Sequence, residues 1–348
     1  HFPSYLGGMI GAITDSLNLL SGTTWRRVSN AAAVLGSYQL SRVRKVAAIH
    51  GFPISISVEP TTSCNLRCPE CPSGLRSFTR PTGSLDDHLF RRVIDQLAPT
   101  LSYLTFYFQG EPFLNPRFLE MVEYAVSQGV YTATSTNGHF MNEASAEKTV
   151  RSGLDRLIIS IDGTDQDTYT SYRVGGSLEK VIQGTESILR WKRKLKSRTP
   201  HVVFQFLVVG PNEDQIHDVS VLARKLGVDQ LVLKTAQIYD YHNGSNLIPS
   251  IEKYSRYIKN ADGTYSLKNR LSDHCWKMWH SCVVTWDGKV VPCCFDKDAH
   301  FVLGDLAQYS FEEIWFGEKY NQFRQSLLKS RSEIEMCRNC TEGTRVWA

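Results

Sequence analysis

The sequence predicts an α/β fold, a partial (β/α)6 barrel with an N-terminal helical segment and a small C-terminal domain made of a hairpin and a helix. From Pro53 onward, short runs of β-branched and aromatic residues alternate with amphipathic stretches, which is typical of βα units with a parallel sheet. Only six such units occur, too few for a closed eight-unit barrel. A predicted hairpin with its turn at Asp287-Gly288, followed by an amphipathic stretch, marks the C-terminal domain.

The individual elements follow from this alternation. The expected strands cover residues 54–58, 103–108, 130–135, 156–161, 202–208 and 230–235, and the helices between them lie near 85–98, 116–128, 143–152, 178–195 and 213–226. The predicted hairpin runs from Cys282 to Cys293, and one helix is expected from Phe311 to about Leu328. The N-terminal segment is expected to be helical, with breaks at Ser21-Gly22, Gly36 and Ser41.

The expected organisation has four parts: residues 1–50 form the helical segment, 51–240 the barrel, 241–273 a linker and 274–348 the C-terminal domain. A chain of 348 residues with 42% hydrophobic and 21% charged residues is long enough for one large domain and a smaller one. The net charge of +4 comes from 39 basic and 35 acidic residues. This dispersed, nearly balanced charge argues against a nucleic-acid partner.

Nine cysteines are an odd number, and no segment resembles a cleaved secretory signal, so a disulfide framework is a poor explanation. A reducing, cytoplasmic setting fits better, and thiols grouped by spacing then suggest metal. The sequence contains no uninterrupted stretch of about 18 apolar residues, so it predicts no transmembrane helix. Residues 5–20 are nevertheless apolar, and two interpretations stay open: a helix packed on the main domain, or peripheral contact with a membrane or a partner.

The strongest motif is the C-x3-C-x2-C triplet Cys64, Cys68 and Cys71, directly after the first expected strand. Three thiolates suit a four-iron cluster and leave one iron without a protein ligand, open to a cofactor or substrate. The alternative, a structural zinc site, needs a fourth Cys or His nearby. The only histidine before His139 in the following stretch is His88, which lies well inside an expected helix.

Three further motifs stand at the ends of the next expected strands. Because parallel strands of a βα barrel end at one face, we expect these motifs to meet the cysteine triplet there. They are Gly110-Glu111-Pro112, then Ser135-Thr136-Asn137-Gly138, then Ser160-Ile161-Asp162-Gly163 with Tyr169 and Arg173 downstream.

Together the triplet and these motifs resemble the radical S-adenosylmethionine (radical SAM) superfamily. The resemblance implies a [4Fe-4S] cluster on the triplet that binds S-adenosylmethionine. It also implies that the Gly110-Glu111-Pro112 segment receives the methionine amino group, that Ser135 and Asn137 meet the ribose, and that the segment with Ser160, Asp162 and Arg173 meets the carboxylate. One departure is Glu70, where the family often has an aromatic residue next to adenine, so no adenine-stacking residue is assigned.

The C-terminal cysteines form a second group. Cys275 and Cys293 stand in a C-x12-G-x4-C pattern around Gly288, and Cys337 and Cys340 form C-x2-C. This group resembles the short, twitch form of the SPASM extension, which implies an auxiliary [4Fe-4S] cluster held by these four cysteines. Two cysteines are left over: Cys282 is expected to be packed, and Cys294 to be a spare ligand, while either is an alternative hydrogen-atom donor.

The resemblance implies an enzyme that reductively cleaves S-adenosylmethionine to a 5′-deoxyadenosyl radical, which removes a hydrogen atom from a substrate. It needs an external one-electron reductant of flavodoxin or ferredoxin type. We expect an oxidoreductase that oxidises or rearranges a small molecule, with the auxiliary cluster as electron relay and with Gln109, Gln205 and Lys234 as candidate substrate contacts. The alternatives are a peptide-modifying enzyme and a non-catalytic iron–sulfur carrier or scaffold.

Overall fold

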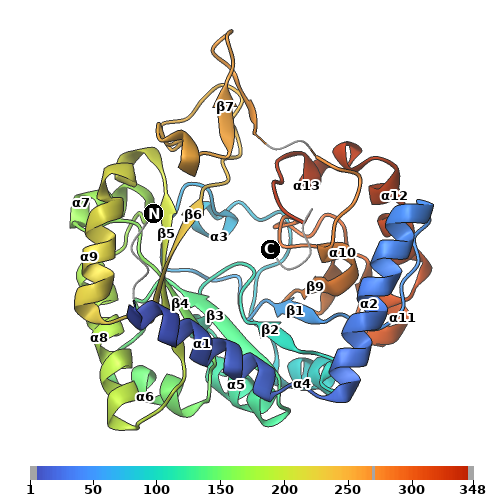
Figure 1. Ribbon diagram of the computed structural model, residues 1–348, viewed down its shortest axis with the longest axis horizontal. Coiled ribbons are helices and arrows are strands. Elements are labelled where there is room, and N and C mark those ends of the chain that lie inside the picture. The colour runs from blue at the N-terminus through green and yellow to red at the C-terminus, as the bar shows by residue number, and fades with distance from the viewer. Residues whose placement is uncertain (1–5, 269–270, 344–348) are drawn as a thin grey trace.

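A computed structural model describes residues 6–268 and 271–343 of the chain (Figure 1). Its centre is a mixed sheet in the order β11-β10-β9-β1-β2-β3-β4-β5-β6. The strands β1 to β6 are parallel to one another, as expected for a partial barrel. Their bounds are Ser55–Val58 (β1), Tyr103–Thr105 (β2), Tyr131–Thr136 (β3), Arg156–Ser160 (β4), His201–Val208 (β5) and Gln230–Thr235 (β6).

Helices cover the outer face of this sheet, each lying between two successive strands (Figure 1). Their apolar sides pack on the strands: Phe90 and Phe118 are buried against Phe106, with ring centroids 5.5 and 5.6 Å away. The predicted α/β barrel is therefore confirmed. The outer helices are α4 (Asp87–Leu97), α5 (Phe118–Ser127), α6 (Glu143–Arg151), α7 (Gln166–Tyr172), α8 (Leu178–Lys194) and α9 (Ile216–Leu226).

The register brings the carboxyl ends of the barrel strands to one edge. Ser57 of β1 pairs with Thr105 of β2, which pairs in turn with Ala133 of β3, and Ser160 at the end of β4 pairs with Gln205 of β5. Segments that follow these strands therefore emerge side by side. β2 is shorter than the predicted 103–108, because the chain leaves the sheet after Thr105 on its way to the turn at residue 110.

The C-terminal hairpin extends the same sheet. β9 (Ser281–Val284) lies parallel to β1, and β10 (Lys289–Val291) and β11 (Gly304–Asp305) continue the sheet beyond it. The predicted single helix from Phe311 is wrong: α11 (Phe311–Trp315) and α12 (Glu318–Lys329) are separate, because the chain is extended at Gly317 between them. Short helices at Lys277–His280 (α10), Arg331–Glu333 (η4) and Glu335–Arg338 (α13) complete the domain.

The segment predicted as a linker contains a small antiparallel hairpin, β7 (Tyr257–Lys259) and β8 (Tyr265–Leu267), preceded by the 3-10 turn η3 (Glu252–Tyr254). This hairpin projects from the body of the molecule (Figure 1). Its base is fixed because the hydroxyl of Tyr257 accepts a hydrogen bond from the Ile238 amide at 2.8 Å and contacts Asn339 at 3.1 Å. The segment thus links the barrel to the C-terminal domain through defined contacts.

Two helices form the N-terminal segment, α1 (Leu6–Ser21) and α2 (Trp25–Arg44). The predicted break at Ser21-Gly22 is confirmed, whereas Gly36 and Ser41 lie inside α2. Gly36 has open space where a side chain would be, and the Ser41 hydroxyl donates to the Ser37 carbonyl one turn back, so neither interrupts the helix. No helix in the described ranges is both long and apolar enough to cross a membrane.

The helix α1 lies across the end of the barrel where the strands begin (Figure 1). Asp15 accepts hydrogen bonds from Tyr131 and Arg156, the first residues of β3 and β4. The opposite face of α1 exposes Ile13 and Leu17. The expectation that this segment packs on the main domain is confirmed.

Candidate active site

The loop with the first three cysteines follows β1 and enters the short helix α3 (Pro72–Leu75). Leu66 is fully buried and anchors the loop, and the Arg67 amide donates to the Val174 carbonyl at 2.9 Å. Gly74 approaches so closely that a Cβ there would lie 2.6 Å from the amide nitrogen of Cys68. The loop is therefore held from both sides, which fixes the direction of its thiols.

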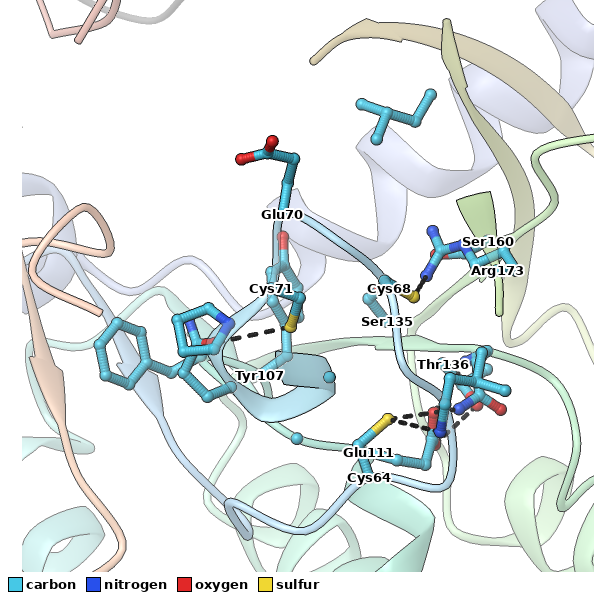
Figure 2. A pocket seen from close by; sticks show the side chains of 18 of the residues that line it. Cys64, Cys68, Glu70, Cys71, Tyr107, Glu111, Ser135, Thr136, Ser160 and Arg173 are labelled. Atoms are coloured by element: carbon cyan, nitrogen blue, oxygen red, sulfur yellow. Dashed lines mark hydrogen bonds between the residues drawn. The ribbon is translucent and has the colours of Figure 1, made fainter. Parts of the chain in front are cut away.

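Cys64, Cys68 and Cys71 line one cavity of about 220 Å³ at the carboxyl ends of the barrel strands (Figure 2). Most residues predicted to contact S-adenosylmethionine line it too: Gly110, Glu111, Ser135, Asn137, Ser160 and Arg173. The two others, Pro112 and Asp162, are buried and do not line it. The structure thus brings the four sequence motifs together around one space.

Two acidic residues, Glu70 and Glu111, line this cavity, and Glu111 is 2% exposed. Its carboxylate accepts hydrogen bonds from the Thr136 hydroxyl and the Asn137 amide, both at 2.8 Å, and from the Phe113 amide at 3.3 Å. Burial raises the pKa of Glu111 to about 7, although these donors act in the opposite direction. A cationic group of a ligand bound in the cavity would favour the ionised form of the Glu111 carboxyl group.

Gly110 holds Glu111 in place through a backbone conformation that other residues rarely adopt. Its φ is +76°, and a Cβ would lie 2.1 Å from the carbonyl oxygen of Thr61. The Gly110 amide donates to the Ser73 hydroxyl at 2.9 Å. After it, Pro112 begins the 3-10 turn η1 (Pro112–Leu114) that Glu111 caps. The close approach of two loops explains why glycine stands here.

Arg173 lines the same cavity and supplies a cation to it (Figure 2). Its Nε donates to Asp162 at 2.5 Å, and its Nη1 lies 3.9 Å from the sulfur of Cys68. The second oxygen of Asp162 accepts the Leu207 amide at 2.7 Å, so this fully buried carboxylate orients the guanidinium from behind. Ser160 lines the same wall.

Other cavity residues were not predicted as cofactor contacts. Thr136 donates a hydrogen bond to Glu111, and its position within the motif Ser135-Thr136-Asn137-Gly138 was the signal that could have identified it. Tyr107 and Lys297 also line the cavity, although no local pattern marks them. Of the substrate contacts expected from the sequence, Gln109 lines the cavity and accepts a contact from Cys71 at 3.8 Å, whereas Gln205 and Lys234 do not line it.

A second cavity of about 340 Å³ adjoins the first, because Pro72 and Lys297 line both. Its far wall comes from the C-terminal domain and includes Met336 and Asn339. The Lys297 ammonium lies 4.4 Å from the centre of the ring of Tyr239, which follows β6 and also lines the second cavity. The second cavity is therefore lined by residues of both the barrel loops and the C-terminal domain.

The four predicted ligands of the second group, Cys275, Cys293, Cys337 and Cys340, are all buried. Three of them belong to an apolar cluster with Trp276 and Trp279. Gly343 approaches them closely, since a Cβ there would lie 2.3 Å from the sulfur of Cys275. These thiols sit in a dry shell, which suits an iron–sulfur cluster.

The two remaining cysteines have different surroundings. Cys282 is 1% exposed and packs in the main core, where its strand pairs with β1, so the expectation that it is packed is confirmed. Cys294 is exposed, and its hydrogen bond with Cys293 lowers its pKa to about 6. Lys277 contacts its sulfur at 4.0 Å.

The two donor sets consist of three and four thiols, which suits iron–sulfur clusters. Among the described residues, no group of three or more His, Cys, Asp or Glu side chains is placed to hold one metal ion. A four-iron cluster has volume and takes thiolates around its surface. Burial raises the pKa of Cys64 and of Cys340 to about 11, so bound iron would supply the charge that ionises these thiols.

Comparisons with known proteins agree with this geometry. The family model of the radical SAM superfamily matches residues 58–223, and that of the SPASM iron–sulfur cluster-binding domain matches residues 275–341. The chain is 25% identical over 301 residues to the tungsten-containing aldehyde ferredoxin oxidoreductase cofactor-modifying protein of Pyrococcus furiosus, covering 77% of this chain and 82% of that protein. It is 26% identical over 319 residues to the PqqA peptide cyclase of Gluconobacter oxydans, covering 85% and 84%.

Among solved structures, SuiB of Streptococcus suis bound to S-adenosylmethionine has a TM-score of 0.61 at 10% identity, covering 83% of this chain and 71% of that chain, a likeness of fold. The chain belongs to the radical SAM superfamily. Its C-terminal part is a SPASM-type domain, so the sequence-based assignment is confirmed for both parts. Its cofactors are accordingly a [4Fe-4S] cluster with S-adenosylmethionine, and auxiliary iron–sulfur chemistry in the SPASM-type domain.

Proposed function

We propose that the chain is a radical SAM oxidoreductase that oxidises or rearranges a small molecule. The observation that carries the proposal is a second cavity that adjoins the one beside the first cysteine group. The cavity beside Cys64, Cys68 and Cys71 shares Pro72 and Lys297 with a second cavity of about 340 Å³, a volume typical of small-molecule sites. A substrate there would lie between the two cofactor sites.

In this proposal the wall residues bind S-adenosylmethionine by charge and hydrogen bonding. Glu111 accepts the amino group, while Ser135 and Asn137 meet the ribose. Arg173 pairs with the carboxylate, and Ser160 donates a hydrogen bond beside it. Cys64, Cys68 and Cys71 would hold the cluster, which together with S-adenosylmethionine supplies reductive cleavage to a 5′-deoxyadenosyl radical that takes a hydrogen atom from the substrate.

Asp162 acts differently from the role that its motif implies. It is fully buried and does not line the cavity, but it bonds Arg173 at 2.5 Å. We assign it as a positioning residue that keeps the guanidinium turned toward the cavity. The apolar side chains of Leu66 and Leu207 also line this cavity.

The second cysteine group would hold an auxiliary cluster on Cys275, Cys293, Cys337 and Cys340. Four thiolate ligands leave no iron open to substrate, so the chemistry it would supply is electron storage. This supports a net oxidation of the substrate. We assign electron supply to an external protein of flavodoxin or ferredoxin type, in a cytoplasmic compartment whose reducing conditions suit nine free cysteines.

A peptide substrate is the second candidate. It is favoured by the 26% identity to the PqqA peptide cyclase, which extends over most of both chains. The two candidates differ in the size of the molecule that must reach the second cavity.

A fractionation experiment separates them. The reconstituted enzyme is supplied with reductant, S-adenosylmethionine and a cell extract divided at about 1 kDa, and 5′-deoxyadenosine is measured. We expect the small-molecule fraction to stimulate its formation, and protease treatment to have no effect. Stimulation by the large, protease-sensitive fraction alone would favour the peptide. No 5′-deoxyadenosine under any condition would leave a non-catalytic iron–sulfur carrier.

A further inference from the structure

Arg331 is a buried cation placed among the C-terminal cysteines. It begins the 3-10 helix η4, directly after α12, and is 1% exposed. Its guanidinium Nη2 donates to the sulfur of Cys340 at 3.2 Å and to the carbonyl of Glu342 at 2.7 Å, and its Nη1 donates to the carbonyl of His274 at 3.3 Å. Its Nε is buried and has no hydrogen-bond partner in the described structure.

In the part of the chain that the structure describes, no carboxylate forms an ion pair with this guanidinium. The nearby Asp273 accepts the backbone amide of Arg331 at 2.9 Å, not its guanidinium. The carboxylate of Glu342 is directed to Lys277, at 2.5 Å. Among the ion pairs of the described residues, none includes Arg331, and a buried, unpaired guanidinium is costly. An anionic group at the neighbouring thiols would therefore stabilise the buried guanidinium of Arg331.

The thiols around Arg331 provide that partner when they ligate iron. A cluster with four thiolate ligands is anionic, and each added electron makes it more so. A fixed positive charge and an N–H···S hydrogen bond stabilise the reduced form more than the oxidised form.

We propose that Arg331 raises the reduction potential of the auxiliary cluster and thereby suits it to accept electrons. This deepens the proposed function, on which it rests, because electron storage is the role assigned to that cluster. Arg331 is a positioning residue in this account, since it acts on the reaction through the cluster.

Two other arginines show that the placement is specific. Arg324 is also fully buried, but it donates to the carbonyls of Met278 and Trp315, and the cysteine that acts on its pKa is Cys282. Arg338 is next to Cys337 in sequence, yet its side chain is exposed and its Nε donates to the Ser332 carbonyl. Arg338 therefore offers a matched control, because water screens its charge.

The test is a potentiometric titration of the anaerobically reconstituted full chain, followed by electron paramagnetic resonance, for wild type, Arg331→Gln, Arg331→Lys and Arg338→Gln. Glutamine keeps a donor but removes the charge. At a fixed potential we expect Arg331→Gln to lower the ratio of reduced to oxidised auxiliary cluster at least about tenfold, which is 59 mV for a one-electron couple. Arg331→Lys should shift it less, and Arg338→Gln less than about twofold.

An unchanged ratio in Arg331→Gln at full iron content, or an equal shift in Arg338→Gln, would overturn the inference. A wild type with only about four irons per chain would instead contradict the auxiliary cluster itself, so the two failures differ. If Arg331→Gln does not fold, wild type labelled with 15N-arginine replaces it. Electron spin-echo modulation of the reduced auxiliary cluster should then change with the label, and no change would overturn the inference.

Discussion

The burial of Glu111 makes the binding of S-adenosylmethionine depend on pH in a way that the structure allows to be worked out. The amino group of the ligand is expected to bind the ionised carboxylate, whose pKa is raised to about 7 by burial. Protonation of Glu111 therefore weakens binding as the pH falls. An ordinary α-amino group has a pKa of about 7.7–8.0, so loss of its charge weakens binding as the pH rises. The affinity should peak between these two values.

The magnitude follows from the two ionised fractions. Near pH 7.4 roughly 70% of Glu111 is ionised, and near pH 6 roughly 10%, so affinity should fall about fivefold to eightfold, or about 1 kcal/mol. In Glu111→Gln the charge-assisted contact is lost, which costs about 1.5–3 kcal/mol and weakens binding on the order of 10- to 100-fold. The acid limb of the pH profile should disappear in this variant.

The assay is calorimetric titration of the cluster-loaded, anaerobic protein with S-adenosylmethionine from about pH 6 to pH 8.5. Asp155 is a useful control, since burial raises its pKa to about 6 but it bonds Thr132 at the start of β3, far along the strand from the cavity. Asp155→Asn should leave the binding profile unchanged. The reasoning would be refuted by a Glu111→Gln protein that binds with wild-type affinity, or by a wild type whose affinity is constant down to pH 6.

Three further changes have expected outcomes. Gly110→Ala should lower the free energy of unfolding in urea by more than about 3 kcal/mol, because there is no room for the added Cβ. The control Gly175→Ala, at a position with φ of +82° and open space, should lower it by about 1 kcal/mol. Equal losses in the two variants would contradict the steric argument. Arg27→Met should lower the unfolding free energy by about 3 kcal/mol, since it removes donors to four backbone carbonyls, and no loss would refute that bracing role. Cys282→Ala should keep the wild-type iron content, whereas Cys275→Ala should lose about four irons, as measured by iron analysis.

The barrel and most of the cavity could be predicted because their signals are local. A parallel strand and the motif after it are continuous in sequence, and the rule that strand ends meet at one edge brings Glu111, Asn137 and Ser160 together. The cysteine spacings are local in the same sense. These predictions needed no knowledge of which segments pair over long distances.

The rest depends on packing between distant segments. Nothing in the hairpin sequence says that Ser281–Val284 pairs with β1, more than 200 residues earlier, and this pairing carries Lys297 to the edge of the first cavity. The burial of Asp162 behind Arg173 depends likewise on contact with Leu207. The contact of Arg331 with Cys340 depends on how η4 and the C-terminal turn fold together.

The central claim is that this chain carries two cysteine-held clusters, of which the first drives radical chemistry. The most direct measurement reconstitutes wild type, Cys64→Ala and Cys337→Ala anaerobically, counts iron and sulfide per chain, and follows 5′-deoxyadenosine with reductant and S-adenosylmethionine. We expect about eight irons in wild type, about four in each variant, and no 5′-deoxyadenosine from Cys64→Ala. About four irons in wild type would mean that the C-terminal cysteines hold no cluster, and no 5′-deoxyadenosine from wild type would mean that the first cluster does not drive radical chemistry.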